Sequence, residues 1–440
     1  MLYKIISNND YSGRVYLPYE FNNIFEHKSY SFTRICSGLK ECNIQTFTDY
    51  ALNRNEIKIS DDIIENLYIP KDLPYQIQCL EKTLILGPVI GLLLDKNNAV
   101  TEKHLKKYMP YTSLYNKIGG LLYVFSLEGI NSENKTIEGY FYNPVISNWV
   151  KAVLPFPQSI FRRILLSKDT IEKFQIATAG RMFNNNFFDK WKFWKAVNKY
   201  HQLAEYLPNT KLLKSISDID DMFNSFDTLI LKPVNGTLGK GLIRVEKIND
   251  QYVFKERNLK KPVLTYSREK ASKYIRDIKK RHSKYIVQQN IDLLKFEDRL
   301  SDFRVIMQKD NTLKWQCTGI VVSMGEPGGI CSNYPYSCYL SFEGFFSKYF
   351  TLSETKISQK KINIVALCKN VCDVIDVEMG NYGDVGIDIG IDRSLKLWIF
   401  EVNEKHYHFM PLLINDYSTY LDVKRNPVKY ATALSGFDLL

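Results

Sequence analysis

The sequence predicts an α/β (α+β) fold made of more than one domain. At 440 residues the chain exceeds what a single hydrophobic core usually serves. Strand-like runs dominate the first 80 residues, whereas strands alternate with helical patterns from about residue 82 onward. A composition of 45% hydrophobic and 24% charged residues is typical of globular proteins. We expect a small β-rich module at 1–80, an open α/β domain at 81–165 and a larger domain at 166–440.

The first module shows strand patterns but no recognisable chemistry. Its β-like runs are Gly13–Leu17, Ile44–Thr48 and Ile57–Ile59, separated by polar turns, and a short helix is expected at Asp61–Leu67. No function follows from these residues.

The second module begins with the apolar run Leu84–Leu94, expected as one buried strand with a glycine break. A basic helix is expected at 104–111 and another apolar strand at 121–127. Gly87 and Gly91 could pack against neighbours or line a substrate cleft, and packing is the more frequent role of such residues.

Two helices are expected in the first part of the larger domain. Asp189 opens a helix to Leu207, where Pro208 ends it; Lys190 in its first turn either is a solvated surface residue or reaches a phosphate. A second helix, capped by Ser217 with Asp220 three residues on, is expected to run to about residue 226.

A strand then delivers a lysine to a glycine-rich loop. The run 229–231 ends at Lys232, and Gly236, Gly239 and Gly241 follow within a few residues. Glycine lets backbone N–H groups close around an anion, and a nucleotide polyphosphate suits such a site, although a tight surface turn is the alternative. The spacing fits neither a Walker A loop nor a Rossmann turn, and the strand-like residues after Gly241 favour a β-hairpin.

Further candidates follow along the chain. The strand 285–291 contains Gln288 and Gln289, whose amides could bond an adenine edge. The strands 302–307 and 313–322 should form a hairpin in which Asp302 and Arg304 share a face, either as a structural salt bridge or as a phosphate clamp. A core-facing helix is expected at 358–380, with the apolar stripe Ile362, Val365, Leu367/Cys368, Val371 and Ile375.

The segment 384–403 predicts a metal-binding hairpin. A turn between Ser394 and Leu395 would pair Ile391 with Trp398, Ile389 with Phe400 and Ile387 with Val402. The same register sets Asp388 opposite Glu401, with Asn403 on the same face, and opposed carboxylates repel unless a cation lies between them. Hard oxygen ligands of this kind suit Mg²⁺, and Gly386 and Gly390 would leave space for a ligand.

Composition narrows the other possibilities. No apolar run reaches the ~20 residues needed to span a bilayer, and the N-terminus lacks a signal-peptide core, so we expect a cytoplasmic protein. The eight cysteines form no Cys-x₂-Cys pair, and buried free thiols are favoured over a metal site at Cys368 and Cys372 or at Cys331 and Cys338. The net charge of +11 invites a nucleic-acid hypothesis, but the basic residues are dispersed.

These stretches together resemble the ATP-grasp superfamily, and residues 84–403 are similar to the YheC/YheD family of endospore coat-associated ATP-grasp proteins. The stretches that support the resemblance are 86–92, 120–125, 186–191, 231–241, 286–289, 302–304, 386–388 and 398–403. The resemblance implies an ATP-grasp fold at 166–440 preceded by a pre-ATP-grasp domain.

The resemblance also assigns roles. It implies that Lys190, Lys232 and Arg304 face the phosphates, with Lys232 and Arg304 acting in catalysis, that Gln288 and Gln289 hold adenine, and that a glycine hairpin covers the phosphates with Asn235, Gly236, Thr237, Gly239 and Gly241. It makes Asp388, Glu401 and Asn403 the Mg²⁺ ligands. Asn333 lies where related ligases carry an asparagine, but the Gly-Gly that usually follows it and the Pro-Gly that usually follows Glu-x-Asn are both replaced.

The function implied is an ATP- and Mg²⁺-dependent carboxylate–amine ligase acting through an acyl-phosphate. Its partners would be ATP, an unidentified carboxylate and amine from the amino-acid or peptide class, and spore-coat proteins. The alternatives are a non-catalytic ATP-binding scaffold of the spore coat and a nucleic-acid-binding protein.

Overall fold

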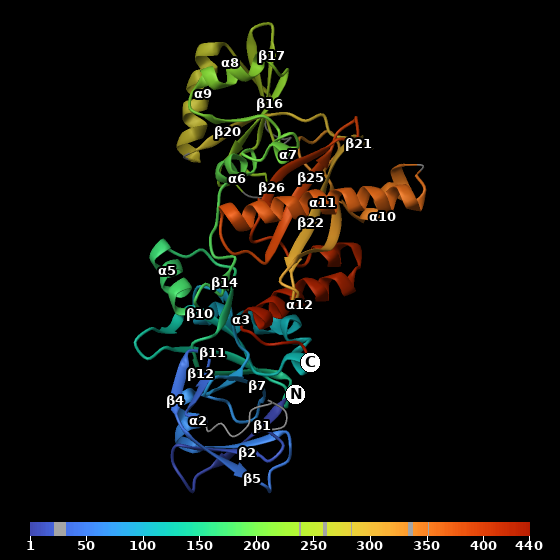
Figure 1. Cartoon of the computed structure of the whole chain (residues 1–440). Coiled ribbons are helices and arrows are strands. Elements are labelled where there is room, and N and C mark those ends of the chain that lie inside the picture. Colours follow the sequence, from blue (N-terminus) through green and yellow to red (C-terminus); the bar gives the residue numbers. More distant parts are fainter. Residues whose placement is uncertain (22–31, 237–238, 258–261, 283, 333–337, 351) are drawn as a thin grey trace.

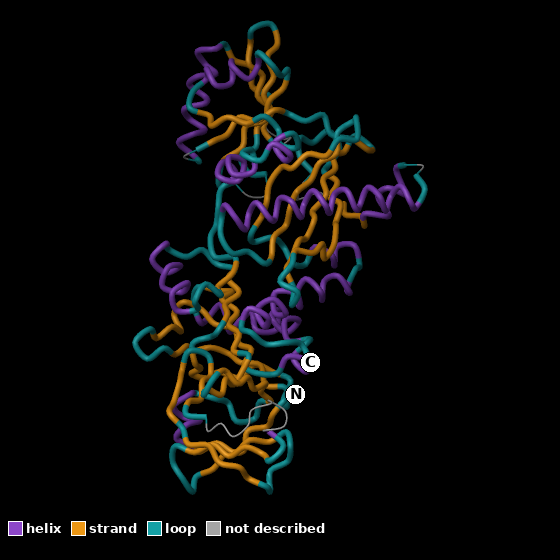
Figure 2. Tube along the Cα trace, in the orientation of Figure 1, coloured by secondary structure: helices purple, strands orange, loops and turns teal. Residues whose placement is uncertain are grey.

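The computed structural model describes residues 1–440 apart from 22–31, 237–238, 258–261, 283, 333–337 and 351. Its described strands form four sheets that follow one another along an elongated molecule (Figures 1 and 2). The sheet built last in the sequence lies between the third sheet and the N-terminal half, and the two termini lie close together beside that half (Figure 1). Among the helices that the structure describes, none combines the length and apolar character needed to cross a membrane.

The first sheet confirms the strand patterns expected for the N-terminal module. Its order is β4-β3-β8-β7-β1-β6-β2-β5. The strands are β1 (Tyr3–Asn8), β2 (Arg14–Pro18), β3 (Arg34–Ser37), β4 (Lys40–Asn43), β5 (Gln45–Asp49), β6 (Glu56–Ser60), β7 (Pro74–Leu80) and β8 (Thr83–Gly87). Helix α2 (Asp61–Leu67) has the bounds expected from the sequence.

The second sheet has a parallel centre, in the order β12-β11-β10-β9-β13-β14. Its strands are β9 (Val89–Asp95), β10 (Leu121–Asn131), β11 (Thr136–Asn143), β12 (Asn148–Pro155), β13 (Ser159–Arg162) and β14 (Met182–Phe183). The helices around it are α3 (Asn98–Tyr108), α4 (Tyr115–Ile118), α5 (Lys168–Ala177) and the 3₁₀ turn η1 (Met109–Thr112).

The single strand expected at 84–94 is wrong. Pro88 interrupts the run, because proline has no N–H to continue a ladder, and β8 and β9 belong to different sheets. Gly87 and Gly91 have packing roles: a Cβ on Gly87 would lie 2.6 Å from the ring of Phe437, and one on Gly91 would lie 2.8 Å from the ring of Phe125.

The third sheet is antiparallel throughout, in the order β15-β20-β16-β17-β18-β19. Its strands are β15 (Thr210–Leu213), β16 (Thr228–Pro233), β17 (Ile243–Ile248), β18 (Gln251–Glu256), β19 (Leu264–Tyr266) and β20 (Tyr285–Gln289), and α8 (Ile216–Phe223) and α9 (Arg268–Arg281) lie together beside it (Figure 1). The hairpin expected after the glycine loop is confirmed. The expected cap at Ser217 is wrong, since Ser215 and Asp218 form the capping box two residues earlier and let Ile216 and Ile219 face the core.

The fourth sheet has the order β24-β23-β22-β25-β26, and β21 pairs with β22. Its strands are β21 (Lys295–Phe296), β22 (Arg299–Lys309), β23 (Trp315–Met324), β24 (Cys338–Ser341), β25 (Asp384–Ile391) and β26 (Leu397–Asn403). The accompanying helices are α6 (Lys190–Val197), α7 (His201–Ala204), α10 (Phe342–Tyr349), α11 (Glu354–Glu378), α12 (Tyr417–Leu434) and the 3₁₀ turn η2 (Met410–Ile414).

Two helix expectations in this region need correction. The helix expected from Asp189 to Leu207 is two helices, α6 and α7, although Asp189 caps the first as expected. On α11, Leu367, Cys368, Val371 and Ile375 are buried, but Ile362 is 59% exposed and Ile364 takes its place in the core. Cys368 and Cys372 are buried free thiols on this helix.

The C-terminal segment returns to the N-terminal half. Val428, Tyr430 and Ala431 of α12 belong to the same core as residues of the first two sheets. After α12 the ring of Phe437 fills the space over Gly87, and the backbone N–H of Leu440 donates to the carbonyl of Lys117 at 2.8 Å. The division of the chain at residues 80 and 165 remains a proposal.

This return of the chain predicts that Phe437 stabilises the N-terminal half. We expect Phe437→Ala to lower the free energy of unfolding by about 3–5 kcal/mol, because it removes a buried ring and leaves a cavity beside Gly87. Equilibrium unfolding in urea measures the change. Leu440→Ala is the control, since this side chain is 48% exposed and its loss should have little effect. Equal effects of the two variants would contradict the packing argument.

Candidate functional site

A cavity of about 370 Å³ lies between the third and fourth sheets. Strands β16 and β20 form one wall, and β25 and β26 form the other. Eight of the predicted site residues line it: Lys190, Lys232, Gly236, Gly239, Gln288, Gln289, Asp388 and Glu401. The segments that supply them are far apart in the sequence, so the fold brings most of the predicted set together.

Four other predicted residues that the structure describes lie at the edges of the cavity or outside it. Asn235 is exposed beside the loop, and Gly241 packs against Pro233. Arg304 and Asn403 reach the cavity through their bonds to Asp388. Thr237 and Asn333 lie outside the described residues.

Lys232 lies at the end of β16 and points toward the opposite wall. Its Nζ donates to Oε1 of Gln288 at 2.6 Å and lies 5.2 Å from the ring centre of Phe400. Burial lowers the pKa of Lys232 to about 8, although the negative charge of Glu401 acts in the opposite direction. The second half of the Gln288 amide donates to Thr210 at 2.9 Å, so both ends of this side chain are engaged within the protein.

Lys190 joins the glycine loop to the β25–β26 hairpin. From the first turn of α6, its Nζ donates to the carbonyl of Gly236 at 2.6 Å and pairs with Oε2 of Glu401 at 3.0 Å. Burial alone would raise the pKa of Glu401, but Lys190, followed by Lys232 and Arg304, outweighs it and lowers the pKa to about 2. Glu401 is therefore ionised at neutral pH.

The β25–β26 hairpin has the expected register at Asp388 and Glu401. Asp388 lies opposite Glu401, and Ile387 lies opposite Val402. Beyond Asp388 the expected register is wrong, because a bulge leaves Phe400 without a strand partner and shifts Ile389 to Ile399.

The two glycines of the hairpin leave room for neighbouring side chains. A Cβ on Gly390 would lie 2.4 Å from the ring of Phe400, so the bulged ring takes the space expected for a ligand. A Cβ on Gly386 would lie 2.8 Å from Cδ of Arg304 and 2.8 Å from Cβ of His406. The sequence could not show this, because the occupying side chains come from the bulge, β22 and the segment after β26.

Arg304 forms an ion pair with Asp388 across β22 and β25. Its Nη2 lies 3.0 Å from Oδ2 of Asp388, and its Nε contacts Oδ1, so the pairing is bidentate. Asp302, the other partner considered from the sequence, accepts instead from the hydroxyl of Ser332. Burial, with a contribution from the charge of Asp388, raises the pKa of Asp302 to about 7.

Asn403 completes the group of oxygen-bearing side chains. Its Nδ2 lies 3.2 Å from Oδ2 of Asp388 and 3.2 Å from Oε1 of Glu401. The three side chains thus converge on one point at the cavity wall. Other lining residues were not predicted, among them Lys240, Arg244, Arg393 and Phe400. Of these four residues, Lys240 could have been proposed from the sequence, because it lies between Gly239 and Gly241 of the loop.

Comparison with known proteins identifies the family of this chain. Residues 179–434 match the family model described as YheC/D like ATP-grasp. Endospore coat-associated protein YheD of Bacillus subtilis (strain 168) is 26% identical over 397 residues, covering 86% of this chain and 86% of that protein. Endospore coat-associated protein YheC of the same organism is 21% identical over 290 residues, covering 63% of this chain and 78% of that protein.

Among solved structures, D-alanyl-alanine synthetase A from Vibrio cholerae O1 biovar eltor str. N16961 aligns with a TM-score of 0.44 and 13% identity, over 80% of this chain and 99% of that one. VanG D-Ala:D-Ser ligase from Enterococcus faecalis aligns with a TM-score of 0.44 and 12% identity, over 78% of this chain and 98% of that one. The family model covers more than half of the chain, including every residue of the cavity. This chain belongs to the YheC/D-like ATP-grasp family.

Proposed function

We propose that this protein is an ATP- and Mg²⁺-dependent carboxylate–amine ligase. One observation supports the proposal most: Lys190 and Lys232 enter the same cavity as the opposed carboxylates of Asp388 and Glu401. Cations for phosphate and oxygen ligands for a divalent ion are what binding of a nucleoside triphosphate requires. The family membership agrees with this chemistry.

Nucleotide would lie between the two sheets. Lys190, Lys232 and the glycine loop from Asn235 to Gly241, including Thr237, would contact its phosphates, and the end of β20 would hold adenine. Gln288 is already bonded on both sides, so its role would be to hold Lys232. Gln289 and the backbone after it, which line the cavity, would then serve the base.

The chemistry of the donor set fits a magnesium ion. Asp388 and Glu401 offer carboxylate oxygens, and the Asn403 amide, whose Nδ2 now donates to both carboxylates, would turn over to present its oxygen to the ion. A bound Mg²⁺ supplies positive charge to the phosphate oxygens and lowers the cost of transferring the γ-phosphoryl group. Glu401 is ionised, as a metal ligand must be.

The reaction would take two steps. In the first step, a substrate carboxylate oxygen attacks the γ-phosphorus, and the bond from this phosphorus to the β–γ bridging oxygen breaks. ADP is released, and the substrate becomes an acyl-phosphate. An amine then attacks the acyl carbon, phosphate departs and the nitrogen loses a proton. Lys232 and Arg304 would stabilise the negative charge that develops on the transferring group. No side-chain nucleophile is needed in this scheme.

A second candidate is a non-catalytic ATP-binding scaffold. Its support is that both named Bacillus subtilis relatives are endospore coat-associated proteins and that residues 405–408 replace the Pro-Gly usual after Glu-x-Asn. In this case spore-coat proteins would be the partners.

Product formation separates the two functions. Incubating the protein with ATP, Mg²⁺ and pools of amino acids or peptides should release ADP and phosphate in equal amounts and yield an amide. Phosphate assays and mass spectrometry of the mixture measure both. Nucleotide binding without release in any pool would favour the scaffold.

Glu401→Gln tests the proposed ion site. The substitution keeps the size of the side chain but removes the charge that Mg²⁺ needs, so the Mg²⁺-dependent part of the ADP affinity should fall at least about tenfold, or ~1.4 kcal/mol. Calorimetry with ADP in Mg²⁺ and in EDTA measures the two affinities. The affinity in EDTA should not fall, since the lysines remain. An unchanged response to Mg²⁺ would count against Glu401 as a ligand.

Lys232 predicts a pH dependence of nucleotide affinity. Its pKa of about 8 means that the ammonium is present below pH 8 and is lost as the pH rises. We therefore expect the ADP dissociation constant to rise above pH 8, approaching tenfold per pH unit, because the uncharged amine attracts phosphate poorly. Lys232→Arg is the matched control, since arginine stays charged in this range. The same pH profile in both proteins would exclude Lys232 as its cause.

A further inference from the structure

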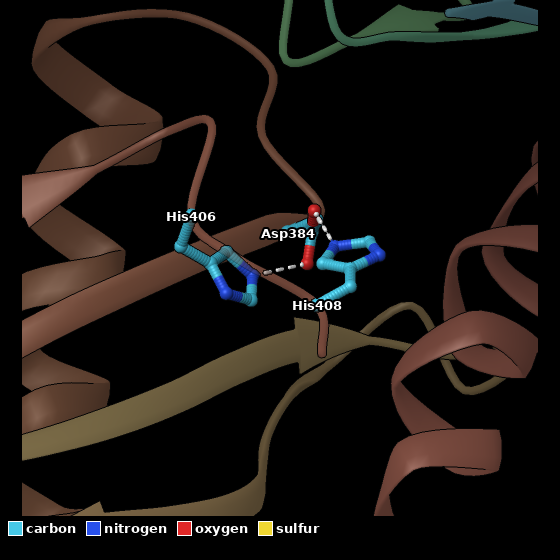
Figure 3. A group of neighbouring side chains, drawn as sticks. All are labelled: Asp384, His406 and His408. Atoms are coloured by element: carbon cyan, nitrogen blue, oxygen red, sulfur yellow. Dashed lines mark hydrogen bonds and ion pairs between the residues drawn. The ribbon is translucent and has the colours of Figure 1, made fainter. Parts of the chain in front are cut away.

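Asp384, His406 and His408 form a buried cluster beside the proposed ion site (Figure 3). Asp384 opens β25, and the two histidines follow β26. Nε2 of His406 lies 2.8 Å from Oδ1 of Asp384, and Nε2 of His408 lies 2.8 Å from Oδ2, so each imidazole takes one carboxylate oxygen. Gln308 of β22 also donates to Oδ1, at 2.7 Å.

The charges in this cluster argue against a metal ion. Nη1 of Arg163 lies 2.8 Å from Oδ2 of Asp384 and also contacts Nε2 of His408, so a guanidinium already balances the single carboxylate. Burial lowers the pKa of both histidines, which leaves them neutral at pH 7. A divalent cation would add two uncompensated charges to a buried site next to Arg163, at a large cost.

The two histidines reach different neighbours. Cβ and Cγ of His406 lie 2.8 and 3.0 Å from the Cβ position of Gly386, where Cδ of Arg304 also lies at 2.8 Å, so the imidazole and the arginine side chain cover the same glycine. Nδ1 of His408 instead lies 3.2 Å from the hydroxyl of Tyr111. Of the two histidines, His406 is therefore the one that lies against the glycine that Arg304 also covers.

The contacts of Arg304 hold one edge of its guanidinium, the edge formed by Nε and Nη2, more firmly than the Nη1 end. Nε and Nη2 bond Asp388, but the contact of Nη1 is with Sδ of Met410 at 3.7 Å, a weak acceptor. A side chain packed beside the methylene groups of Arg304 would keep its guanidinium on Asp388. The Nδ1 of His406 has no partner among the described residues, so the bond to Asp384 is what orients the ring.

We propose that His406 is a positioning residue for the ion site: Asp384 fixes its ring over Gly386, and the ring holds Arg304 against Asp388. The inference rests on the proposed function, because it concerns how Asp388 is held ready for Mg²⁺. Removing a residue that holds a metal ligand in place without itself touching the metal typically lowers the metal affinity by about 10–100-fold.

His406→Ala tests the proposal, and His408→Ala is its matched control. Both variants remove one imidazole from Asp384, but only the first removes a neighbour of Arg304. We expect His406→Ala to weaken the Mg²⁺-dependent part of ADP binding about tenfold and His408→Ala to change it less than twofold, as measured by calorimetry. His406→Gln, which keeps an amide donor for Asp384 and methylene groups over Gly386, should restore most of the affinity. Equal losses in the two alanine variants would overturn the proposal.

A crystal structure of His406→Ala gives a readout that does not need nucleotide. Displacement of the Arg304 guanidinium from Asp388 is expected, and an unchanged ion pair would overturn the proposal even if affinity fell. If the wild-type protein shows no Mg²⁺-dependent nucleotide affinity, the proposed function fails, and the position of Arg304 in this variant still decides the role of His406. If His406→Ala does not fold, a crystal structure of His406→Gln decides instead: its methylene groups over Gly386 should keep the Arg304 guanidinium on Asp388, and a displaced guanidinium would overturn the proposal.

Discussion

The opposed carboxylates of Asp388 and Glu401 impose the main electrostatic constraint on this structure. Two acidic side chains facing each other in a partly closed site repel, and the cost of burying them is met only if cations lie close by. The chain supplies these cations from separate elements: Arg304 from β22, Lys190 from α6 and Lys232 from β16. The third sheet and α6 therefore contribute the lysines that balance the charge created by the pairing of β25 with β26.

The sequence predicted the part of the site that depends on alternation along adjacent strands. In a hairpin with a buried face, a one-residue slip would turn every apolar side chain outward, so the pairing of Ile387 with Val402 could be derived, and the facing of Asp388 and Glu401 followed from it. The bulge at Phe400 could not be derived. It depends on the open space over Gly390, which only the folded structure reveals.

Interactions between strands that are distant in the sequence also could not be predicted, because they depend on which strands become neighbours in the folded sheet. Arg304 and Asp302 share a face of β22, and the sequence alone suggested that they could pair with each other. The partner of Arg304 is Asp388 because β25 lies beside β22 in the sheet, a neighbour that is 84 residues away along the chain. In the same way, the cluster around Asp384 joins β22, β25 and two loops, and no local pattern signals it. The break between α6 and α7 and the strand break at Pro88 were missed because apolar residues continue across both.

The ion pairs of the cavity also indicate how nucleotide could enter without a large electrostatic cost. Lys190 contacts both Glu401 and the Gly236 carbonyl, so it links the glycine loop to the β25–β26 hairpin. A nucleotide arriving with its ion would bring one negative partner for Lys190 and one positive partner for Glu401. Lys190 would then exchange one negatively charged partner for another, and Glu401 would exchange one positively charged partner for another. No charge would be left buried without a partner. Lys190 also bonds the Gly236 carbonyl of the glycine loop. If Lys190 turned to the phosphates, the loop would lose this bond and gain contacts with the phosphates in its place.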